Sequence, residues 1–176
     1  MDIAVLGGGC FWCIEALYKN IKGVVKVEPG YSGGDVENPT YEEVSAGNTG
    51  HAEVVRVEFD NSLLSYEMII KLFFVAHDPT TLNRQGFDVG TQYRSVIFYL
   101  NDYQKKIANK VKEELKEEKL FPNPIVTEIK KLPQFYLAEE YHHNYFEKNP
   151  NNAFCQTVIN PKLNKLKSLF SNLIVE

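Results

Sequence analysis

The first 21 residues pass from an apolar strand pattern through a run of glycines into a helix pattern. The segment DIAVL at 2–6 predicts a short, buried strand. The glycines at 7–9 permit a tight turn and close approach by another molecule. From residue 11 to residue 21, one stripe of a helix collects the apolar side chains Ile14, Leu17, Tyr18 and Ile21. This beginning predicts a sheet with a helix packed on it, joined by a loop that a ligand can reach.

The same two patterns recur along the chain. Further strands are predicted at 23–31, 51–59, 93–100 and 124–132, and further helices at 65–77, 101–119 and 138–148, with a short helix from Pro161. Two intervening stretches, 32–50 and 78–92, are rich in turn-forming residues, and loops of this length are usually functional or disordered. We therefore predict a single α/β domain over residues 1–176, an α+β sandwich with long functional loops. Its C-terminal tail is expected to be irregular and flexible from about residue 149.

Charge and composition exclude several classes of protein. The net charge is −4, whereas a nucleic-acid-binding surface is basic. No stretch approaches the roughly 20 apolar residues that a membrane span requires. The N-terminus has no basic segment followed by a long apolar run, so it is not read as a secretory signal, and we expect a cytoplasmic protein. The three cysteines, at 10, 13 and 155, do not form a disulfide framework and are expected to be catalytic, metal-binding or buried.

Cys10 lies where the glycine loop enters the first helix. The first N–H groups of a helix are unpaired, and the positive end of the helix dipole favours an anion. A cysteine at this position tends to have a lowered pKa, and its thiolate is the reactive form. We interpret Cys10 as a reactive thiol, with a buried structural cysteine as the alternative.

Two aromatic residues and a second thiol follow Cys10 directly. Phe11 and Trp12 cannot both face inward at the start of a helix, so at least one lines the surface and could form an apolar pocket for a small alkyl group. Cys10 and Cys13 make a C-x-x-C pair, which fits a dithiol redox motif, half of a zinc site, or a coincidence. Zinc sites need four ligands and the chain has no second C-x-x-C, so we expect no metal.

The strand predicted at 51–59 carries a carboxyl group on its apolar face. Side chains alternate along a strand, so Glu53 shares a face with Val55, Val57 and Phe59. A carboxyl group there is desolvated and keeps its proton, as a general acid near neutral pH must. The alternative is that Glu53, at the start of the strand, bends into solvent.

Several long motifs occur in a fixed order along the chain: GCFWC, GYSGG, NPTY, GNTGHAE, HDPT, NRQGFDVGTQYRS, and AEEYHHNY followed by KNP and FC. From Gly7 to the region of Cys155, these motifs closely resemble the A-type peptide methionine sulfoxide reductases. The resemblance implies a ferredoxin-like core and reduction of methionine S-sulfoxide, free or within oxidised proteins. It also implies regeneration by thioredoxin without a metal or organic cofactor, and we expect a monomer.

The resemblance also assigns roles to residues. Cys10 matches the nucleophile that attacks the sulfoxide sulfur, and Glu53 matches the proton donor to the sulfoxide oxygen. Phe11 and Trp12 match the aromatic residues that hold the substrate methyl group. An acid in this position contributes a rate factor of ~10²–10⁴.

Three further residues match positions around the substrate. Tyr41 and Tyr93 match tyrosines that hydrogen-bond near the sulfoxide oxygen. Asp88 matches a residue that helps to place the substrate backbone. Tyr41 and Asp88 lie in the two stretches predicted to be loops, and Tyr93 begins the strand predicted at 93–100.

The sulfenic acid left on Cys10 has two possible resolving thiols. Cys155 matches the resolving cysteine of the family, and a mobile tail meets disulfide geometry more easily than a helix turn does. Cys13 stands where many members have glycine, so it could resolve directly, relay a disulfide from Cys155, or do neither.

Two functions of other classes stay open. A general dithiol–disulfide oxidoreductase would use Cys10 and Cys13, although the chain lacks a proline-bearing thioredoxin motif. A non-enzymatic domain would bind peptides through the aromatic loop, and it would keep full function after Cys10→Ser.

Overall fold

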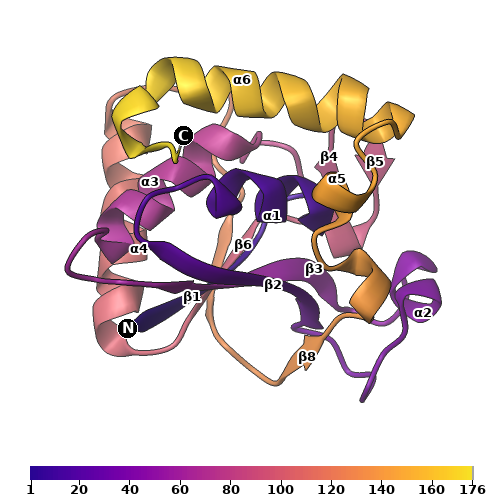
Figure 1. Cartoon of the computed structure of the whole chain (residues 1–176). Helices are drawn as coiled ribbons and strands as arrows, with labels where there is room; N and C mark the ends of the chain where they lie inside the picture. The colour runs from indigo at the N-terminus through magenta and orange to yellow at the C-terminus, as the bar shows by residue number, and fades with distance from the viewer. Residues whose placement is uncertain (176) are drawn as a thin grey trace.

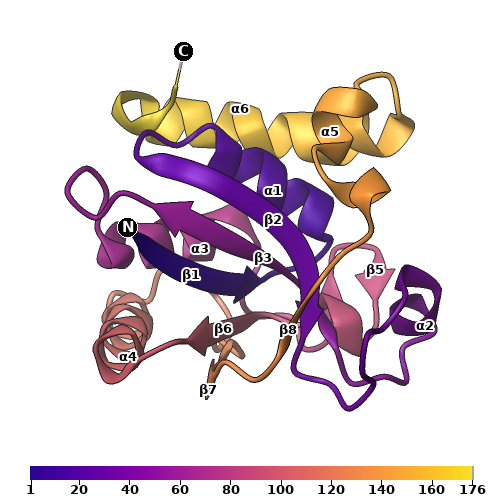
Figure 2. The same ribbon diagram turned by 60° about the horizontal axis from the view of Figure 1, so that its bottom comes forward.

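The structure, a computed structural model that describes residues 1–175, is built around one curled six-stranded sheet (Figures 1 and 2). The strand order is β7-β6-β1-β3-β2-β8, and every neighbouring pair is antiparallel except β6 and β7. The strands are β1 (Asp2–Gly7), β2 (Val24–Ser32), β3 (Ala52–Phe59), β6 (Val96–Tyr99), β7 (Glu128–Lys131) and β8 (Phe135–Leu137). The predicted mixed α/β class is confirmed. The ferredoxin-like core stays a prediction, which the β-α-β-β-α-β chain order through β6 supports.

The helices form layers over the sheet. In both views α6 (Asn160–Leu169) lies over α1 (Phe11–Lys19), and α1 lies over β2 (Figures 1 and 2). Because α1 is covered on both sides, it is buried almost all round, and even Glu15 is only 1 % exposed. The other helices are α2 (Tyr41–Ser45), α3 (Tyr66–Ala76), α4 (Asp102–Glu117) and α5 (Tyr145–Lys148).

Side-chain caps fix where several helices begin. Ser65 accepts a hydrogen bond from the Met68 N–H at the start of α3, and Asn101 does the same for Gln104 at the start of α4. Thr40 forms a capping box with Glu43 at the start of α2, although this helix has only five residues. The caps therefore define helices even where the surrounding sequence is rich in turn residues.

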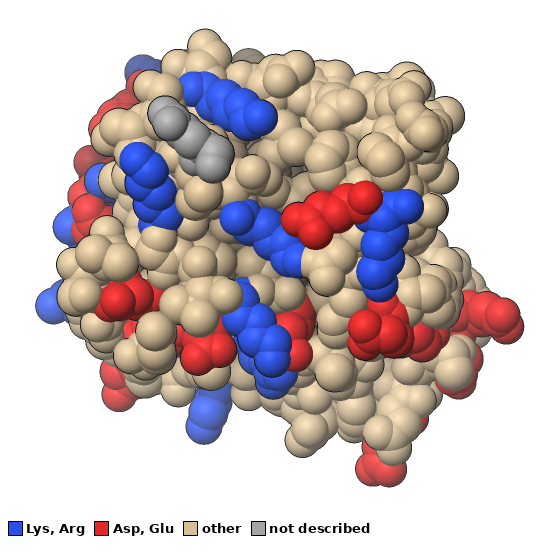
Figure 3. Space-filling model, in the orientation of Figure 1, with Lys and Arg blue, Asp and Glu red and all other residues tan. Residues whose placement is uncertain are grey.

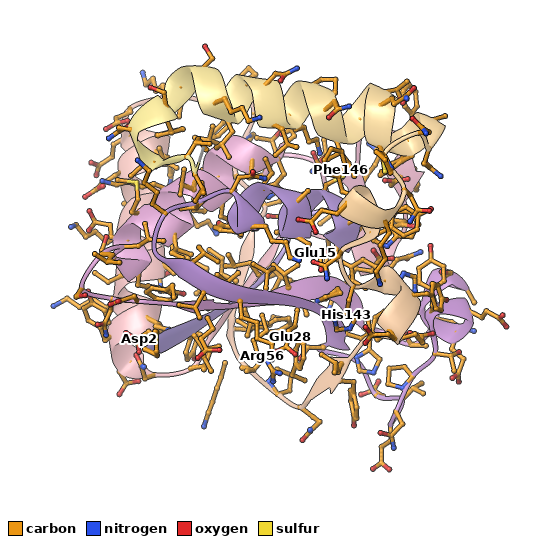
Figure 4. All side chains as sticks on the ribbon, viewed as in Figure 1. Asp2, Glu15, Glu28, Arg56, His143 and Phe146 are labelled. Carbon is orange, nitrogen blue, oxygen red and sulfur yellow. The ribbon has the colours of Figure 1, made fainter. Side chains whose placement is uncertain are left out.

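The main hydrophobic core lies between the sheet and the helices, and a smaller one lies on the opposite face of the sheet. On the face of the sheet that carries the smaller core, an ion pair joins Arg56 of β3 to Glu28 of β2 at 2.7 Å (Figure 4). The Arg56 guanidinium also lies 4.5 Å from the centre of the Phe135 ring in β8. Among residues 1–175, no helix is both long and apolar enough to cross a membrane.

Three local predictions are wrong. The stretches read as loops contain α2 and a small hairpin of β4 (Arg84–Gln85) and β5 (Asp88–Val89). The helix predicted at 138–148 is a 3₁₀ turn at 140–142 followed by α5, because Asn144 takes a left-handed φ of 58° between them. The tail read as irregular is helical from 153 to 169, with a π-helical turn at Cys155–Ile159, while its flexibility stays a prediction.

Candidate active site

Cys10 is the residue that caps the N-terminus of α1, directly after the glycine loop that follows β1. Gly9 has a φ of +91°, and a Cβ atom there would lie 2.7 Å from the Cγ of Gln85. Only glycine fits both this conformation and this close approach. The loop therefore brings Gly9, the residue before Cys10, against Gln85 of the β4–β5 hairpin, and another side chain at residue 9 would push the loop and the hairpin apart.

Glu53 lies beneath the start of α1 and is only 1 % exposed. Its Oε1 accepts a hydrogen bond from the Phe11 N–H at 3.1 Å, while its buried Oε2 has no partner in the described chain. Burial raises the pKa of Glu53 to about 8, and the nearby Asp88 carboxylate adds to the effect. At neutral pH this carboxyl group keeps its proton, and one oxygen stays available to a bound molecule.

The two thiols of the C-x-x-C pair are buried together at the start of α1. Burial raises the pKa of Cys10, and its hydrogen bond to Cys13 and the neighbouring Glu53 add to the increase. The lowered pKa that the helix end predicted for Cys10 is therefore wrong in this structure, because desolvation outweighs the helix dipole. The hydrogen bond from Cys10 lowers the pKa of Cys13, so ionisation of the pair favours Cys13.

Phe11 and Trp12 divide between the core and the surface, as their adjacency requires. Phe11 is 1 % exposed and its ring centre lies 5.6 Å from that of Tyr31. Trp12 is partly exposed and stacks on Tyr145, with ring centres 3.7 Å apart and planes 6° from parallel. Its indole N–H donates to Nδ1 of His142 at 3.0 Å. The aromatic pair therefore makes one apolar wall beside Cys10.

Two tyrosines and an aspartate complete the surroundings of the thiol. Tyr41 begins α2, and burial followed by the charge of Glu53 raises its pKa to about 12. Tyr93 lies in a 3₁₀ turn before β6, and burial, Glu53 and Tyr41 together raise the pKa of its hydroxyl. Asp88 in β5 also has a raised pKa, because it is partly buried. The structure brings these residues, which come from separate segments of the sequence, around Cys10 and Glu53.

The family model for peptide methionine sulfoxide reductases matches residues 2–173. The chain belongs to this family. It is 55 % identical over 174 residues to "Peptide methionine sulfoxide reductase MsrA" of Saccharolobus solfataricus, covering 99 % of this chain and 97 % of the relative. It is also 51 % identical over 174 residues to the MsrA of Polynucleobacter asymbioticus, covering 99 % of this chain and 92 % of that one.

Two solved structures are similar to this peptide methionine sulfoxide reductase family member. Reduced Mxr1 from Saccharomyces cerevisiae superimposes with a TM-score of 0.80 at 36 % identity, covering 88 % of each chain. Mxr1 in complex with Trx2 gives a TM-score of 0.56 at 26 % identity, covering 82 % of this chain and 84 % of that one.

In this family member, Cys155 lies in the π-helical turn ahead of α6 and is fully buried. Burial raises the pKa of Cys155, and Cys13 makes the second contribution. Both residues belong to the same hydrophobic core cluster. All three cysteines are free. Residues 149–161 contain no charged side chain, and the upper right of Figure 3, over the start of α6, is uncharged.

Two further residues support the site: Glu139, which was not singled out from the sequence, and His142, which was considered there only as a residue that could orient the tail. Glu139 accepts hydrogen bonds from the Tyr31 hydroxyl at 2.8 Å and from the Tyr41 N–H at 2.9 Å. Burial opposes the charged form of Glu139, but these hydrogen bonds outweigh it and lower its pKa. His142 holds Trp12 and lies 4.4 Å from the Tyr41 ring, measured between ring centres. The only sequence signal for either was their place in the AEEYHHNY motif.

A buried carboxyl group outside the site ties α1 to the segment before α5. Glu15 accepts a hydrogen bond from the Asn144 N–H at 3.1 Å, and Figure 4 shows it on α1 close to His143. Burial raises the pKa of Glu15. Among residues 1–175, no group of three or more His, Cys, Asp or Glu side chains is arranged to hold a metal ion.

Proposed function

We propose that this chain reduces methionine S-sulfoxide, free or within proteins, to methionine by thiol chemistry at Cys10. The observation that carries the proposal is the protonated, buried carboxyl group of Glu53 beside a thiol that lies at the start of α1. A sulfoxide sulfur is a poor electrophile until its oxygen is protonated. An acid with a pKa near the working pH and one unpaired oxygen is suited to supply that proton.

In the proposed complex, the substrate methyl group lies against Phe11 and Trp12. The sulfoxide oxygen faces Glu53 and the hydroxyl groups of Tyr41 and Tyr93. A tyrosine whose pKa is raised keeps its proton and donates hydrogen bonds throughout the physiological range. Asp88 places the substrate backbone. These roles follow from the family resemblance and fit the chemistry of each group.

The chemical step forms a bond from the Cys10 sulfur to the sulfoxide sulfur, and Glu53 protonates the sulfoxide oxygen. The oxygen then passes to the Cys10 sulfur while the bonds from the methionine sulfur to that oxygen and to Cys10 break, so methionine leaves and Cys10 carries a sulfenic acid. Cys10 loses its S–H proton during the step, which restores the proton that Glu53 gave. The sulfur of methionine is reduced and the sulfur of Cys10 is oxidised, so the step needs no metal or organic cofactor.

A second thiol then attacks the sulfenic acid, releasing water and forming a disulfide. We propose Cys155 as the resolving thiol and thioredoxin as the dithiol that reduces the disulfide. We further propose that the chain from about residue 149 shifts to bring the buried sulfur of Cys155 into disulfide geometry with Cys10. Cys13, hydrogen-bonded to Cys10 and near Cys155, is the alternative resolving thiol or a relay between them.

We also propose that residues 1–176 act as one domain and as a monomer in the cytoplasm. The free thiols support a reducing compartment. The acidic net charge of −4 is consistent with small-molecule and protein substrates and not with nucleic acid.

The test is a turnover assay that resolves the two sulfoxide epimers. Wild type and Cys10→Ser receive a peptide with racemic methionine sulfoxide, with dithiothreitol as reductant. Loss of the S epimer alone, and only with Cys10 present, supports the reductase and its nucleophile. If wild type consumes neither epimer, the proposal fails, and insulin-disulfide reduction tests the dithiol oxidoreductase instead. Full peptide binding by an inactive wild type would favour the non-enzymatic domain.

A further inference from the structure

The β4–β5 hairpin holds apolar side chains out in solvent. Phe87 has a relative exposure of 104 %, and Leu82 and Val89 are each 71 % exposed. Single exposed apolar residues are ordinary on a protein surface, but three within eight positions of one hairpin region are not.

Hydrogen bonds hold the backbone of the hairpin, so the exposed side chains do not belong to a disordered loop. Its loop has Gly86 at a φ of 59° followed by Phe87, the arrangement of a two-residue turn that needs glycine first. Gln85 accepts a hydrogen bond from the Asp78 N–H at 2.8 Å and donates to the Asp78 carbonyl at 2.9 Å. The Gly90 N–H donates to the Asn83 carbonyl at 2.9 Å. The fold therefore fixes the backbone that carries these apolar side chains.

The hairpin also forms part of the rim of the candidate active site. Gln85 packs against Gly9, the residue before Cys10. Asp88 pairs with Gln85 across the hairpin and lies near Glu53. In both views β5 lies on the same side of the molecule as α2, which carries Tyr41 (Figures 1 and 2). The hairpin is therefore close enough to the thiol for a polypeptide bound at Cys10 to contact it.

The substrate within a protein has neighbours of a defined chemistry. Methionine is among the most often buried residues, so the segment that carries it usually contributes further apolar side chains to the same core. Oxidation makes its side chain polar and disrupts the core, which exposes the segment around it. The free amino acid has no such neighbours and would touch only the residues around Cys10.

We propose that the surface formed by Leu82, Phe87 and Val89 binds apolar residues that flank a methionine sulfoxide in an unfolded polypeptide. The inference rests on the proposed reductase function and adds to it a basis for preferring peptide over free substrate. The occupant is a flexible apolar segment, because a hairpin tip with three separate side chains offers contacts without a closed pocket.

The test compares Phe87→Ser with Leu63→Ser. Leu63 is also apolar and is 72 % exposed. It follows the C-terminal end of β3, whereas Glu53 lies near the N-terminal end, so Leu63→Ser is a control of matched chemistry away from the site. Dithiothreitol serves as reductant, which removes any dependence on thioredoxin. The substrates are free methionine S-sulfoxide, a peptide with Leu and Val beside the sulfoxide, and the same peptide with Ser and Gly there. Because Phe87 makes few contacts in the free protein, its replacement leaves the fold intact.

The expected result is a fall in kcat/KM, on the order of 10-fold and mainly through KM, for Phe87→Ser with the apolar-flanked peptide alone. Leu63→Ser matches wild type with all three substrates. An equal fall with all three substrates, or no fall with the apolar-flanked peptide, overturns the inference. A fall seen only when thioredoxin replaces dithiothreitol would assign the surface to the reductant, and a dimer lost in Phe87→Ser would assign it to a second copy. An inactive wild type would instead overturn the proposed function.

Discussion

The two sides of the candidate site are held in different ways. Cys10 and Glu53 belong to α1 and β3, where a hydrogen bond from the Phe11 N–H to Glu53 spans 42 residues of sequence. Cys155 belongs to the helical segment 153–169, which lies on α1 through apolar side chains such as Ile159, Leu163 and Leu166. Among the described residues, no hydrogen bond or ion pair joins 153–169 to anything outside 152–170.

The helical segment also contains its own weak point. Pro161 has no N–H to donate within the helix, and its ring crowds the preceding turn. The π-helical turn at Cys155–Ile159 lies directly before it, and such turns often mark functional sites. Apolar contacts are non-directional, so residues 153–169 can separate from α1 without breaking a specific hydrogen bond to it.

This difference matches the two tasks in the proposed reaction. Protonation and attack on the sulfoxide need fixed geometry, which β3 and the start of α1 provide. Resolution needs a buried thiol to travel to Cys10, which a segment held only by apolar contacts permits. Rigidity in β3 and α1 and mobility in 153–169 can therefore be altered separately by substitution.

The largest expected effect is on turnover supported by thioredoxin. Cys155→Ser should form one methionine per enzyme molecule and then stop, because the sulfenic acid on Cys10 is left without its resolving thiol. A quench experiment that counts methionine per enzyme, with a sulfenic-acid trap, measures this. Cys13→Ser is the matched comparison and should keep turning over. If Cys13→Ser stops and Cys155→Ser continues, Cys13 is the resolving thiol and the segment 153–169 need not move.

On the rigid side, Glu53→Gln should lower the rate of the chemical step by ~10²–10⁴, because the amide fits the site but cannot give a proton. In wild type the rate should fall as pH rises through about 8, where Glu53 loses its proton. Single-turnover rates from pH 6 to pH 10 measure both effects. Glu58→Gln, on the opposite face of β3, should leave the rate and the profile unchanged. An undiminished rate in Glu53→Gln would remove the proton-donor role.

The same carboxyl group should affect stability in a pH-dependent way. The pKa of Glu53 rises from an ordinary 4.5 to about 8 on folding. The contribution of this carboxyl group to the free energy of unfolding is therefore complete below about pH 4.5 and is lost as pH rises through about 8. The free energy of unfolding of Glu53→Gln, measured relative to that of wild type, should therefore increase as pH rises. The increase should be at most about 1.4 kcal/mol per pH unit. Urea unfolding at pH 6 and pH 9 measures the difference, and a constant difference would contradict the raised pKa.

Much of the region formed by β3 and the start of α1 was predictable from local sequence. The alternation in 51–59 predicted that Glu53 faces the core, and the glycine run predicted that Cys10 caps a helix. The main strands and helices were also predicted, because each has a periodic apolar pattern. The short elements were missed: α2 depends on the Thr40 capping box inside a turn-rich stretch, and β8 has only three residues.

The support around the site was not predictable, because it depends on distant contacts. Glu139 binds the N–H of Tyr41 across 98 residues, and His142 binds Trp12 across 130. No local pattern indicates such pairs. The raised pKa of Cys10 was missed for a similar reason: the helix end is visible in sequence, whereas the layer that buries it is not.

A smaller effect is expected from the contact that orients Trp12. Burial lowers the pKa of His142 to about 4, so at neutral pH its unprotonated Nδ1 accepts the indole N–H. His142→Phe should reduce kcat/KM about 10-fold, since it leaves that N–H unpaired. His142→Asn, which can present an oxygen near the position of Nδ1, should lose less. Trp12 is the only tryptophan in the chain, so its fluorescence reports the orientation directly. Matching emission and activity in both variants would contradict the role.

The last prediction compares the two regions by amide hydrogen exchange in the reduced protein. Amides of residues 153–169 should exchange at least ~10-fold faster than those of β3 and α1. This corresponds to a free energy of local opening that is about 1.4 kcal/mol lower for the segment held by apolar contacts. Leu163→Ala should widen the difference, since it removes a buried side chain from those contacts. Ala153→Ser, an exposed change in the same segment, is the control. If 153–169 exchanges as slowly as β3, the segment opens only with the whole domain, and resolution by Cys155 would require a different movement.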